Sequence, residues 1–500
     1  MRFFILFLPI FLLAIPSLQE VLNFPYSYYR DFYLTEYLKK TKDPKKAEFL
    51  YNQITYKKNY HFKLLANRNK KYMELYECKH PNSHNWKRID IECMIQNGFN
   101  LRDISKMKDN EIKKLLNTLP ESTTKEEISI LYNKKYLKMF GNRTYFYDIF
   151  MSTKPNIWIP SLYINNISYD KKFYSFLNYV VRAHNLDRVK QSLLNLHYKE
   201  LSDKYKFLLA LNAITLHRYN LAIHILKSKK RKNNQDNFWL YLLTKNKKYA
   251  DKLLRNKRLD FYTLYMYEKY NKVYHIDKIK VFNKAKVIYN INNPLDVIKF
   301  YKDKVKIKDS FKFAKQLDNK KMLPLKALVL DKAFKYQKNY YIMPKYNLKD
   351  LNTTQKALFY ALARQESRFI PAQISHSYAI GLMQMMPFLI RSFHPKEDIS
   401  QFFKANVNVK YAKKHLKWLM RRLNSPIFVS YAYNGGIGFT KRKVKKYFKF
   451  DGLYEPFLSM ELVPYTESRE YAKKVVTNYV IYKNLLGDRI SLHKVLEGLY

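Results

Sequence analysis

The stretch SDKYKFLLALNAITLHRYNLAIHIL, residues 202–226, decides the fold. Apolar side chains recur in it at three- and four-residue steps, which is the spacing of one face of an α-helix. The pattern predicts a helix from Ser202 to Leu216, a turn at 217–219 and a second helix after it. The apolar positions are Tyr205, Leu208, Leu209, Ala213 and Leu216, then Ala222, Ile225 and Leu226. We interpret these stripes as core packing, although stacked helices can also present a concave binding surface.

Similar second-helix patterns flank this hairpin. One begins at Val189 and another at Ala250, 33 residues before and 28 residues after Ala222. Degenerate repeats of about this length indicate stacked helix pairs. We therefore predict a mainly α chain, in which residues 19–275 form an α-superhelical domain and residues 276–340 a helical linker. A compact domain that contains most of the glycines follows over residues 341–500.

Glycine is distributed unevenly along the chain. Seven of the nine glycines lie between Gly381 and Gly498. Glycine is needed where the backbone turns tightly or approaches a ligand closely. The working site is therefore expected in the later part.

Glu366 is the candidate catalytic residue. Asn352 and the two threonines after it are good helix N-cap residues, and apolar residues follow at helical spacing until Pro371 stops the helix. Glu366 then lies near the C-terminus, where the helix dipole disfavours a negative charge and helps to keep the carboxyl protonated. A general acid needs this proton, but a lone Glu near a helix end is usually a surface residue.

Two later segments carry groups suited to holding a sugar. In the first, Gly381 permits close backbone approach, Gln384 offers a donor and an acceptor, and Met386 gives an adaptable apolar contact. In the second, Tyr433 and Asn434 stand just before a glycine turn, and they can contact a ring and its acetamido group.

These motifs together resemble the soluble lytic transglycosylases, whose catalytic domain is a lysozyme-like, mostly helical α+β domain similar to goose-type lysozyme. The resemblance covers roughly residues 341–500 and rests on four blocks in the family's order: Ala363–Ser367, Gly381–Pro387, Ala432–Gly436 and Pro464–Tyr471. It implies that Glu366 is the catalytic acid and base. It also implies a sugar-binding groove lined by Ser375, Gln384, Met386, Tyr433, Asn434 and Glu467. Members of the family carry a helical superhelix and a linker ahead of this domain.

The chain departs from the family pattern at three positions. Tyr378 stands where a small residue, often Gly, is usual, Ile380 replaces a small polar residue, and Ser468 replaces the commoner Thr. Tyr378 leaves the detailed shape of the groove and its saccharide preference open. None of the three removes a group that the chemistry requires.

The expected mechanism uses one carboxylate. No second Asp or Glu occurs between Glu366 and Pro387, which favours assistance by the substrate's own acetamido group. The resemblance implies cleavage of the β-1,4 bond between N-acetylmuramic acid and N-acetylglucosamine in peptidoglycan, with formation of 1,6-anhydromuramyl ends. Two alternatives stay open: a muramidase-type hydrolase on the same fold, and a catalytically silent cell-wall scaffold. The helical part could dock other cell-wall enzymes.

Residues 1–18 are typical of a secretory signal peptide, because a basic start precedes a short apolar run. The alternative is an uncleaved membrane anchor. Export predicts a periplasmic protein. In an oxidising compartment the two cysteines, Cys78 and Cys93, can form a disulfide, and two buried thiols are the alternative.

The net charge of +52 does not decide the function. The excess of lysine is spread over the whole chain together with many Tyr, Phe, Asn and Ile residues, as an AT-rich coding sequence produces. We expect no nucleic-acid partner, but a general attraction to anionic wall polymers and membrane surfaces. The scattered histidines predict no metal site, and no cofactor is expected.

Overall fold

The computed structural model describes residues 16–97, 100–141, 143–393, 398–448 and 452–499. Within these ranges the chain is helical, and its only β-type pairings are the three isolated bridges Asp277–Tyr340, Ile374–Ile380 and Ile380–Met385. The predicted mainly α fold is thereby confirmed. Residues 1–15 of the expected signal peptide lie outside the described residues. None of the described helices is long and apolar enough to cross a membrane.

The hairpin at residues 202–226 forms as its periodicity predicts. Helix α14 spans Asp203–Thr215, and α15 spans Tyr219–Lys227. Between them His217 adopts a left-handed conformation with φ of 58°, which reverses the chain. The buried Asn212 side chain of α14 donates to the carbonyl oxygen of Lys190 at 2.9 Å and so ties the hairpin to the preceding helix.

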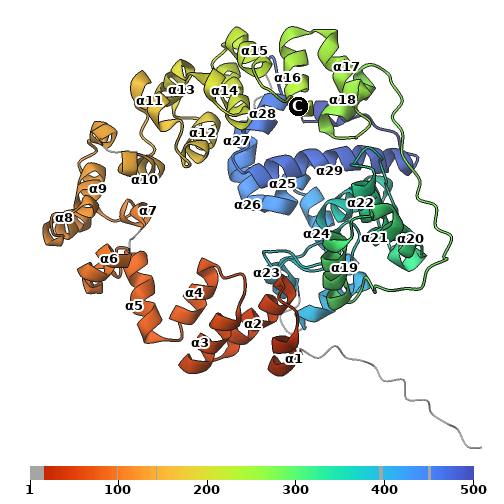
Figure 1. Cartoon of the computed structure of the whole chain (residues 1–500), viewed down its shortest axis with the longest axis horizontal. Helices are drawn as coiled ribbons and strands as arrows, with labels where there is room; N and C mark the ends of the chain where they lie inside the picture. The colour runs from red at the N-terminus through yellow and green to blue at the C-terminus, as the bar shows by residue number, and fades with distance from the viewer. Residues whose placement is uncertain (1–15, 98–99, 142, 394–397, 449–451, 500) are drawn as a thin grey trace, which may run out of the picture.

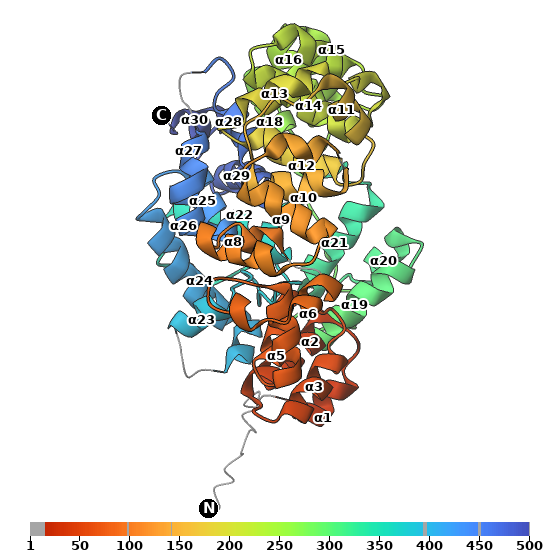
Figure 2. The same ribbon diagram turned by 90° about the vertical axis from the view of Figure 1, so that its left-hand side faces the viewer.

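Short helices continue this arrangement through the first half of the chain. They are α1 (Leu18–Asn23), α2 (Tyr28–Lys40), α3 (Pro44–Gln53), α4 (Asn59–Ala66), α5 (Lys70–Lys79), α6 (Ile91–Asn97), α7 (Leu101–Ile104), α8 (Asp109–Thr118), α9 (Thr123–Tyr132), α10 (Arg143–Thr153), α11 (Ser161–Ile167), α12 (Phe173–Arg182), α13 (Asp187–Ser192), α16 (Asn234–Thr244), α17 (Lys247–Arg255) and α18 (Phe261–Lys269). Figures 1 and 2 show that they follow one another along an arc from α1 to α18.

The remaining helices make the connector and the compact later part. The connector begins without a helix over residues 271–293 and then forms α19 (Pro294–Lys306), α20 (Ser310–Gln316) and α21 (Leu323–Ala333). The later part contains α22 (Thr353–Ser367), α23 (Pro387–Phe393), α24 (Ala405–Met420), α25 (Pro426–Gly435), α26 (Ile437–Phe439), α27 (Lys445–Tyr447), α28 (Phe457–Leu462), α29 (Thr466–Leu485) and α30 (Leu492–Glu497). Helix α29 packs against both α22 and α25.

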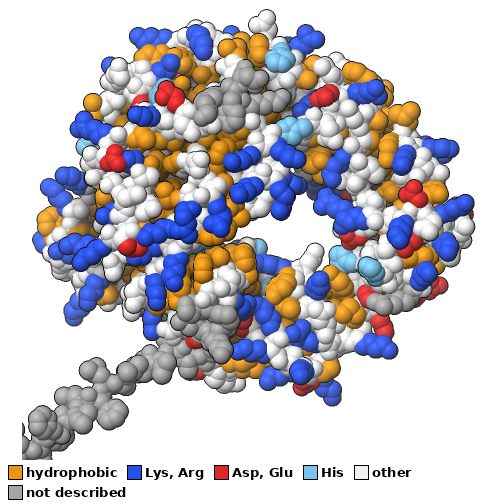
Figure 3. Space-filling view, turned by 180° about the vertical axis from the view of Figure 1, so that it is seen from behind, with side chains coloured by type: hydrophobic (Ala, Val, Ile, Leu, Met, Phe, Trp, Pro, Cys, Tyr) orange, Lys and Arg blue, Asp and Glu red, His pale blue; other side chains and the backbone are white. Residues whose placement is uncertain are grey.

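The later part lies between the two ends of the arc, so the molecule is a ring (Figure 1). Figure 3 shows an opening through the ring, with lysine and arginine side chains around it. The contacts that close the ring join residues far apart in the sequence. Tyr378 contacts His61 at one end of the arc, and Arg182 Nε donates to the carbonyl oxygen of Glu461 at 3.0 Å nearer the other.

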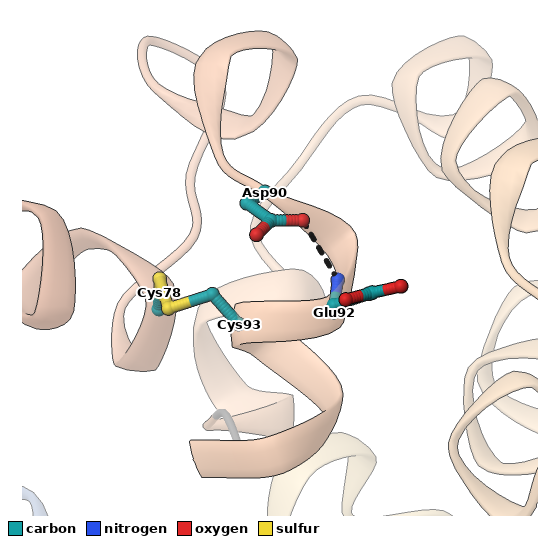
Figure 4. Close-up of a disulfide and its surroundings, with 4 residues drawn as sticks. All are labelled: Cys78, Asp90, Glu92 and Cys93. Carbon is teal, nitrogen blue, oxygen red and sulfur yellow. Dashed lines mark hydrogen bonds between the residues drawn. A yellow bond between two sulfur atoms is a disulfide. The ribbon is translucent and has the colours of Figure 1, made fainter.

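Cys78 and Cys93 are joined by a disulfide that links α5 to α6 (Figure 4). At the start of α6 the Asp90 carboxylate accepts the backbone N–H of Glu92 at 3.0 Å, which satisfies a free donor of the helix N-terminus. Of the two alternatives for the cysteines, the structure has the disulfide.

Candidate active site

Glu366 lies in the last turn of α22. The helix starts with a capping box, in which the Asn352 side chain accepts the backbone N–H of Gln355 at 2.9 Å and Gln355 Oε1 accepts the N–H of Asn352. It ends at Ser367 because Arg368 adopts a left-handed conformation, with φ of 54°. The helix therefore stops before Pro371, and it presents Glu366 at its C-terminal end.

The surroundings of Glu366 favour its protonated form. Burial raises the pKa of the Glu366 carboxyl to about 8, although a hydrogen bond from Tyr471 acts in the opposite direction. The negative charge of Glu467 adds to the rise in the pKa. At neutral pH the carboxyl therefore keeps its proton, as a general acid requires.

Tyr471 holds the Glu366 carboxyl in place. Its hydroxyl donates to Glu366 Oε1 at 2.5 Å, and its ring is almost completely buried. Tyr471 was not among the predicted site residues. The available signal was its spacing of four residues from Glu467, since residues four apart share one face of a helix and both belong to α29.

The segment from Gln373 to Met386, called here the site loop, carries three of the predicted groove residues. Its turn is built by Ser375, whose hydroxyl accepts the backbone N–H groups of Ser377 at 3.2 Å and Ala379 at 3.0 Å. The Gln384 amide nitrogen donates to the carbonyl oxygens of Gly381 at 2.8 Å and Gln373 at 3.2 Å. Ser375 and Gln384 thus shape the loop itself. Met386 is partly buried where the loop enters α23.

Gly381 must be glycine in this loop. Its φ is +85°, and a Cβ atom there would lie 2.1 Å from Asn408 Nδ2 and 2.3 Å from the carbonyl oxygen of Phe402. Asn408 is fully buried, donates to the carbonyl oxygens of Ile380 and Phe402, and accepts the N–H of Met383 at 2.9 Å. It fixes the inner side of the site loop. Sequence reasoning missed it, because nothing in its neighbourhood on α24 marks it.

Helix α25 connects the site loop to α29. The Tyr433 hydroxyl donates to the carbonyl oxygen of Met383 at 2.8 Å, and burial together with the charge of Glu366 raises the pKa of Tyr433. Asn434 Nδ2 donates to Glu467 Oε1 at 3.2 Å, while the Ser468 hydroxyl donates to Asn434 Oδ1 at 2.6 Å. The structure thus gathers Tyr433, Asn434 and Glu467 around the helix end that carries Glu366.

The same region matches a known family. Residues 347–454 match the family described as "Transglycosylase SLT domain". The chain contains a transglycosylase SLT domain. The match includes Glu366, the site loop and α25, whereas Glu467 and Tyr471 lie just beyond its end.

Curated relatives share this part of the chain. The soluble lytic murein transglycosylase of Escherichia coli K12 is 29% identical over 145 residues, which are 27% of this chain and 22% of that protein. The protein of the same name from Salmonella typhimurium is 29% identical over 140 residues, or 26% of this chain and 21% of the relative. The matched region thus spans less than a quarter of the length of these relatives.

Two solved structures are similar over most of the chain. One is an inactive mutant of the lytic transglycosylase Slt from Pseudomonas aeruginosa, with 15% identity, a TM-score of 0.49 and coverage of 93% of this chain and 80% of that one. The other is the 70 kDa soluble lytic transglycosylase from Escherichia coli, with 16% identity, a TM-score of 0.40 and coverage of 92% and 73%.

The described residues contain no group of three His, Cys, Asp or Glu side chains that could hold a metal ion.

Proposed function

We propose that this protein is a lytic transglycosylase that cleaves the β-1,4 bond between N-acetylmuramic acid and N-acetylglucosamine in peptidoglycan and leaves 1,6-anhydromuramyl ends. The observation that carries the proposal is the Glu366 carboxyl, whose pKa is about 8 and which Tyr471 holds at 2.5 Å within an SLT domain. The curated relatives, which are named murein transglycosylases, support the class of substrate.

In the proposed reaction Glu366 acts first as an acid and then as a base. Because Tyr471 donates to Oε1, the acid proton resides on Oε2, from which it passes to the glycosidic oxygen as the C1–O4 bond breaks. The substrate's acetamido oxygen stabilises the positive charge at C1. The Glu366 carboxylate then takes the proton of the muramyl 6-hydroxyl, and that oxygen bonds to C1. Neither step consumes water.

The groove residues have distinct proposed roles. Tyr433 and Asn434 are proposed to contact the sugar from α25, and Glu467 to orient Asn434 and keep the Glu366 pKa high. The site loop, through Ser375, Gln384 and Met386, is proposed to form the facing wall.

We further propose that the protein works in the periplasm after removal of a signal peptide that lies within residues 1–18. Two observations support export. The apolar run after a basic start is typical of a signal peptide, and the Cys78–Cys93 disulfide suits an oxidising compartment.

A hydrolase is the second candidate, and the charge of Glu467 beside Glu366 favours it. A second carboxylate close to the acid could activate water, as in ordinary glycosidases. Digestion of purified peptidoglycan followed by mass spectrometry separates the candidates. Ends lighter by one water support the transglycosylase, unmodified reducing ends support the hydrolase, and no release supports a scaffold.

The substitution Glu366→Gln tests the central residue. It removes the proton that is transferred, so release of fragments should fall about 10³-fold. The matched control is Glu121→Gln, an exposed glutamate paired with Lys125, which should leave activity unchanged. Wild-type activity should decline above about pH 8, as Glu366 ionises. A fully active Glu366→Gln variant would overturn the assignment.

A further inference from the structure

The site loop touches the opposite end of the chain. Tyr378, at its tip, is buried against α2 and α4, and its hydroxyl lies 3.1 Å from His61 Nε2 and 3.4 Å from Thr35 Oγ1. His61 and Thr35 are fully buried. The Tyr378 ring also packs edge-on against Phe32. A residue that departs from the family pattern thus has a defined set of partners more than 300 positions away.

The surrounding hydrogen bonds fix the tautomer of His61. His61 Nδ1 accepts the backbone N–H of Lys58 at 3.1 Å, so the ring proton is on Nε2 and points toward Tyr378. The Thr35 hydroxyl donates to the carbonyl oxygen of Asp31 at 2.6 Å, so its oxygen is left to accept. His61 Nε2 therefore donates toward the two hydroxyl oxygens, Tyr378 at 3.1 Å and Thr35 at 3.3 Å, which lie 3.4 Å from each other. His61, Tyr378 and Thr35 are therefore hydrogen-bonded to one another in their uncharged forms.

A second set of contacts surrounds this buried core. Lys58 donates from Nζ to the carbonyl oxygen of His376 and lies 4.8 Å from the centre of the Tyr378 ring. The Tyr28 ring meets the His376 ring edge-on at 5.3 Å. Just after the loop, Arg391 of α23 pairs with Glu36 of α2 at 2.6 Å. We call these contacts between the site loop with α23 and helices α2 and α4 the loop junction.

The backbone of the site loop needs such support. Tyr378 and Gln384 both have positive φ, 65° and 46°, which is unfavourable for residues with a Cβ atom and persists only where the surroundings impose it. Asn408 and Tyr433 hold the loop from inside the SLT domain, through hydrogen bonds to the backbone of Ile380 and Met383. The tip near Tyr378 is held by α2 and α4.

We propose that Tyr378 is a positioning residue, and that α2 and α4 hold the site loop in the shape that binds the glycan through the His61–Tyr378–Thr35 hydrogen bonds. This inference rests on the proposed function, because the bound glycan is the one proposed there. Tyr378 does not touch the reacting atoms. Its loss should therefore weaken substrate binding and leave the acid step at Glu366 intact.

The test compares Tyr378→Phe with Tyr169→Phe, a control in which an exposed tyrosine loses its hydrogen bond to Glu200. With soluble glycan strands, Tyr378→Phe should raise KM about three- to tenfold, the effect of one buried hydrogen bond, with kcat within twofold of wild type. Amide hydrogen exchange should become faster in residues 375–386 and stay unchanged in α22. The control should move neither quantity.

Substitutions of His61 test the same inference independently. His61→Leu should reproduce the effects of Tyr378→Phe, while His61→Gln, whose amide nitrogen can take the place of Nε2, should restore much of the binding. Unchanged KM and unchanged loop exchange in both Tyr378→Phe and His61→Leu would overturn the inference, and so would lower activity without faster loop exchange. A wild-type protein that releases nothing from peptidoglycan would defeat the proposed function instead, and the exchange measurement would still decide whether α2 and α4 hold the loop.

Discussion

The later part of the chain, which contains the SLT domain, meets the helical arc at two places that are built from different chemistry. The loop junction is centred on neutral groups, with the Tyr378 hydroxyl between His61 and Thr35. The second contact, called here the helix junction, is centred on buried charge. There Lys473 Nζ donates to Glu461 Oε1 at 2.8 Å, and both side chains are almost completely buried.

The arc surrounds this ion pair with polar groups. Glu461 Oε1 also accepts from the Tyr262 hydroxyl at 2.7 Å and from Gln235 Nε2 at 2.8 Å. Burial would raise the pKa of Glu461, but the charges of Lys473 and Arg469 outweigh it and lower the pKa to about 2. Removing one partner of a buried pair leaves a charge that nothing compensates, whereas a neutral hydrogen bond contributes little net stability. We therefore expect the helix junction to contribute more to the free energy of unfolding. The loop junction should mainly affect the conformation of the site loop.

The largest expected effect comes from Lys473→Met. This change leaves the Glu461 charge buried without its main partner and should lower the free energy of unfolding by about 3 to 5 kcal/mol. Urea unfolding followed by circular dichroism measures it. Combining it with Glu461→Gln removes both charges and should recover part of the loss. A single variant that loses less than about 1 kcal/mol would show that the comparison is wrong.

Acidification should separate the two junctions. Burial, together with the charges of Lys58, Lys39 and Lys57, lowers the pKa of His61 to about 4, below its ordinary value of 6.5. Because the unfolded chain then binds this proton first, stability falls by about 3 kcal/mol as the pH drops from 6.5 to 4.

The stability that ionised Glu461 contributes to the folded state, by contrast, is lost only as the pH falls from about 4.5 toward 2. Hydrogen exchange should therefore show the 375–378 segment opening before α28. The control is His61→Gln, which cannot titrate and should remove the first step. If both segments opened at the same pH, the predicted difference between the loop junction and the helix junction would be wrong.

The smallest effect is expected at the rim of the loop junction. Arg391→Met breaks the ion pair with Glu36 at 2.6 Å, but the Arg391 side chain is 44% exposed. Exposed pairs contribute little, so the loss should be about 0.5 kcal/mol and should shrink in high salt. Like Lys473→Met, the variant removes one cation from an ion pair that lies at a contact between the arc and the later part of the chain. If Arg391→Met and Lys473→Met lowered the free energy of unfolding equally, burial would not determine the contribution of these ion pairs.

Local patterns were enough to predict much of the fold. The hairpin of α14 and α15 follows from apolar periodicity, and the start of α22 follows from the cap at Asn352. The same pattern placed Glu366 in the last turn of a helix. These features depend on residues within a few positions of one another, which is why they could be predicted from the sequence.

Distant contacts could not be predicted in this way. His61 and Tyr378 are 317 residues apart, and no periodicity connects them. Asn408 supports the site loop from another helix, and nothing local marks it. Tyr471 is an intermediate case, because its spacing from Glu467 placed it on the right face of α29 but could not show that it reaches Glu366. The expected helical linker also begins with a non-helical segment, residues 271–293, that the short amphipathic patterns did not reveal.

The closed path of the chain in Figure 1 has a mechanical consequence. In a helical superhelix each repeat contacts only its neighbours, so a superhelix with a free end can relieve strain by moving that end. The first helices of this arc are held by Tyr378 and its last helices by Glu461. Because both ends are attached, the distance between them is fixed. A change in the packing of α8 or α9, which lie across the ring from α22 in Figure 1, therefore strains the two attachments instead of moving a free end. Of the two attachments, the loop junction is held by neutral hydrogen bonds, and we expect it to yield first.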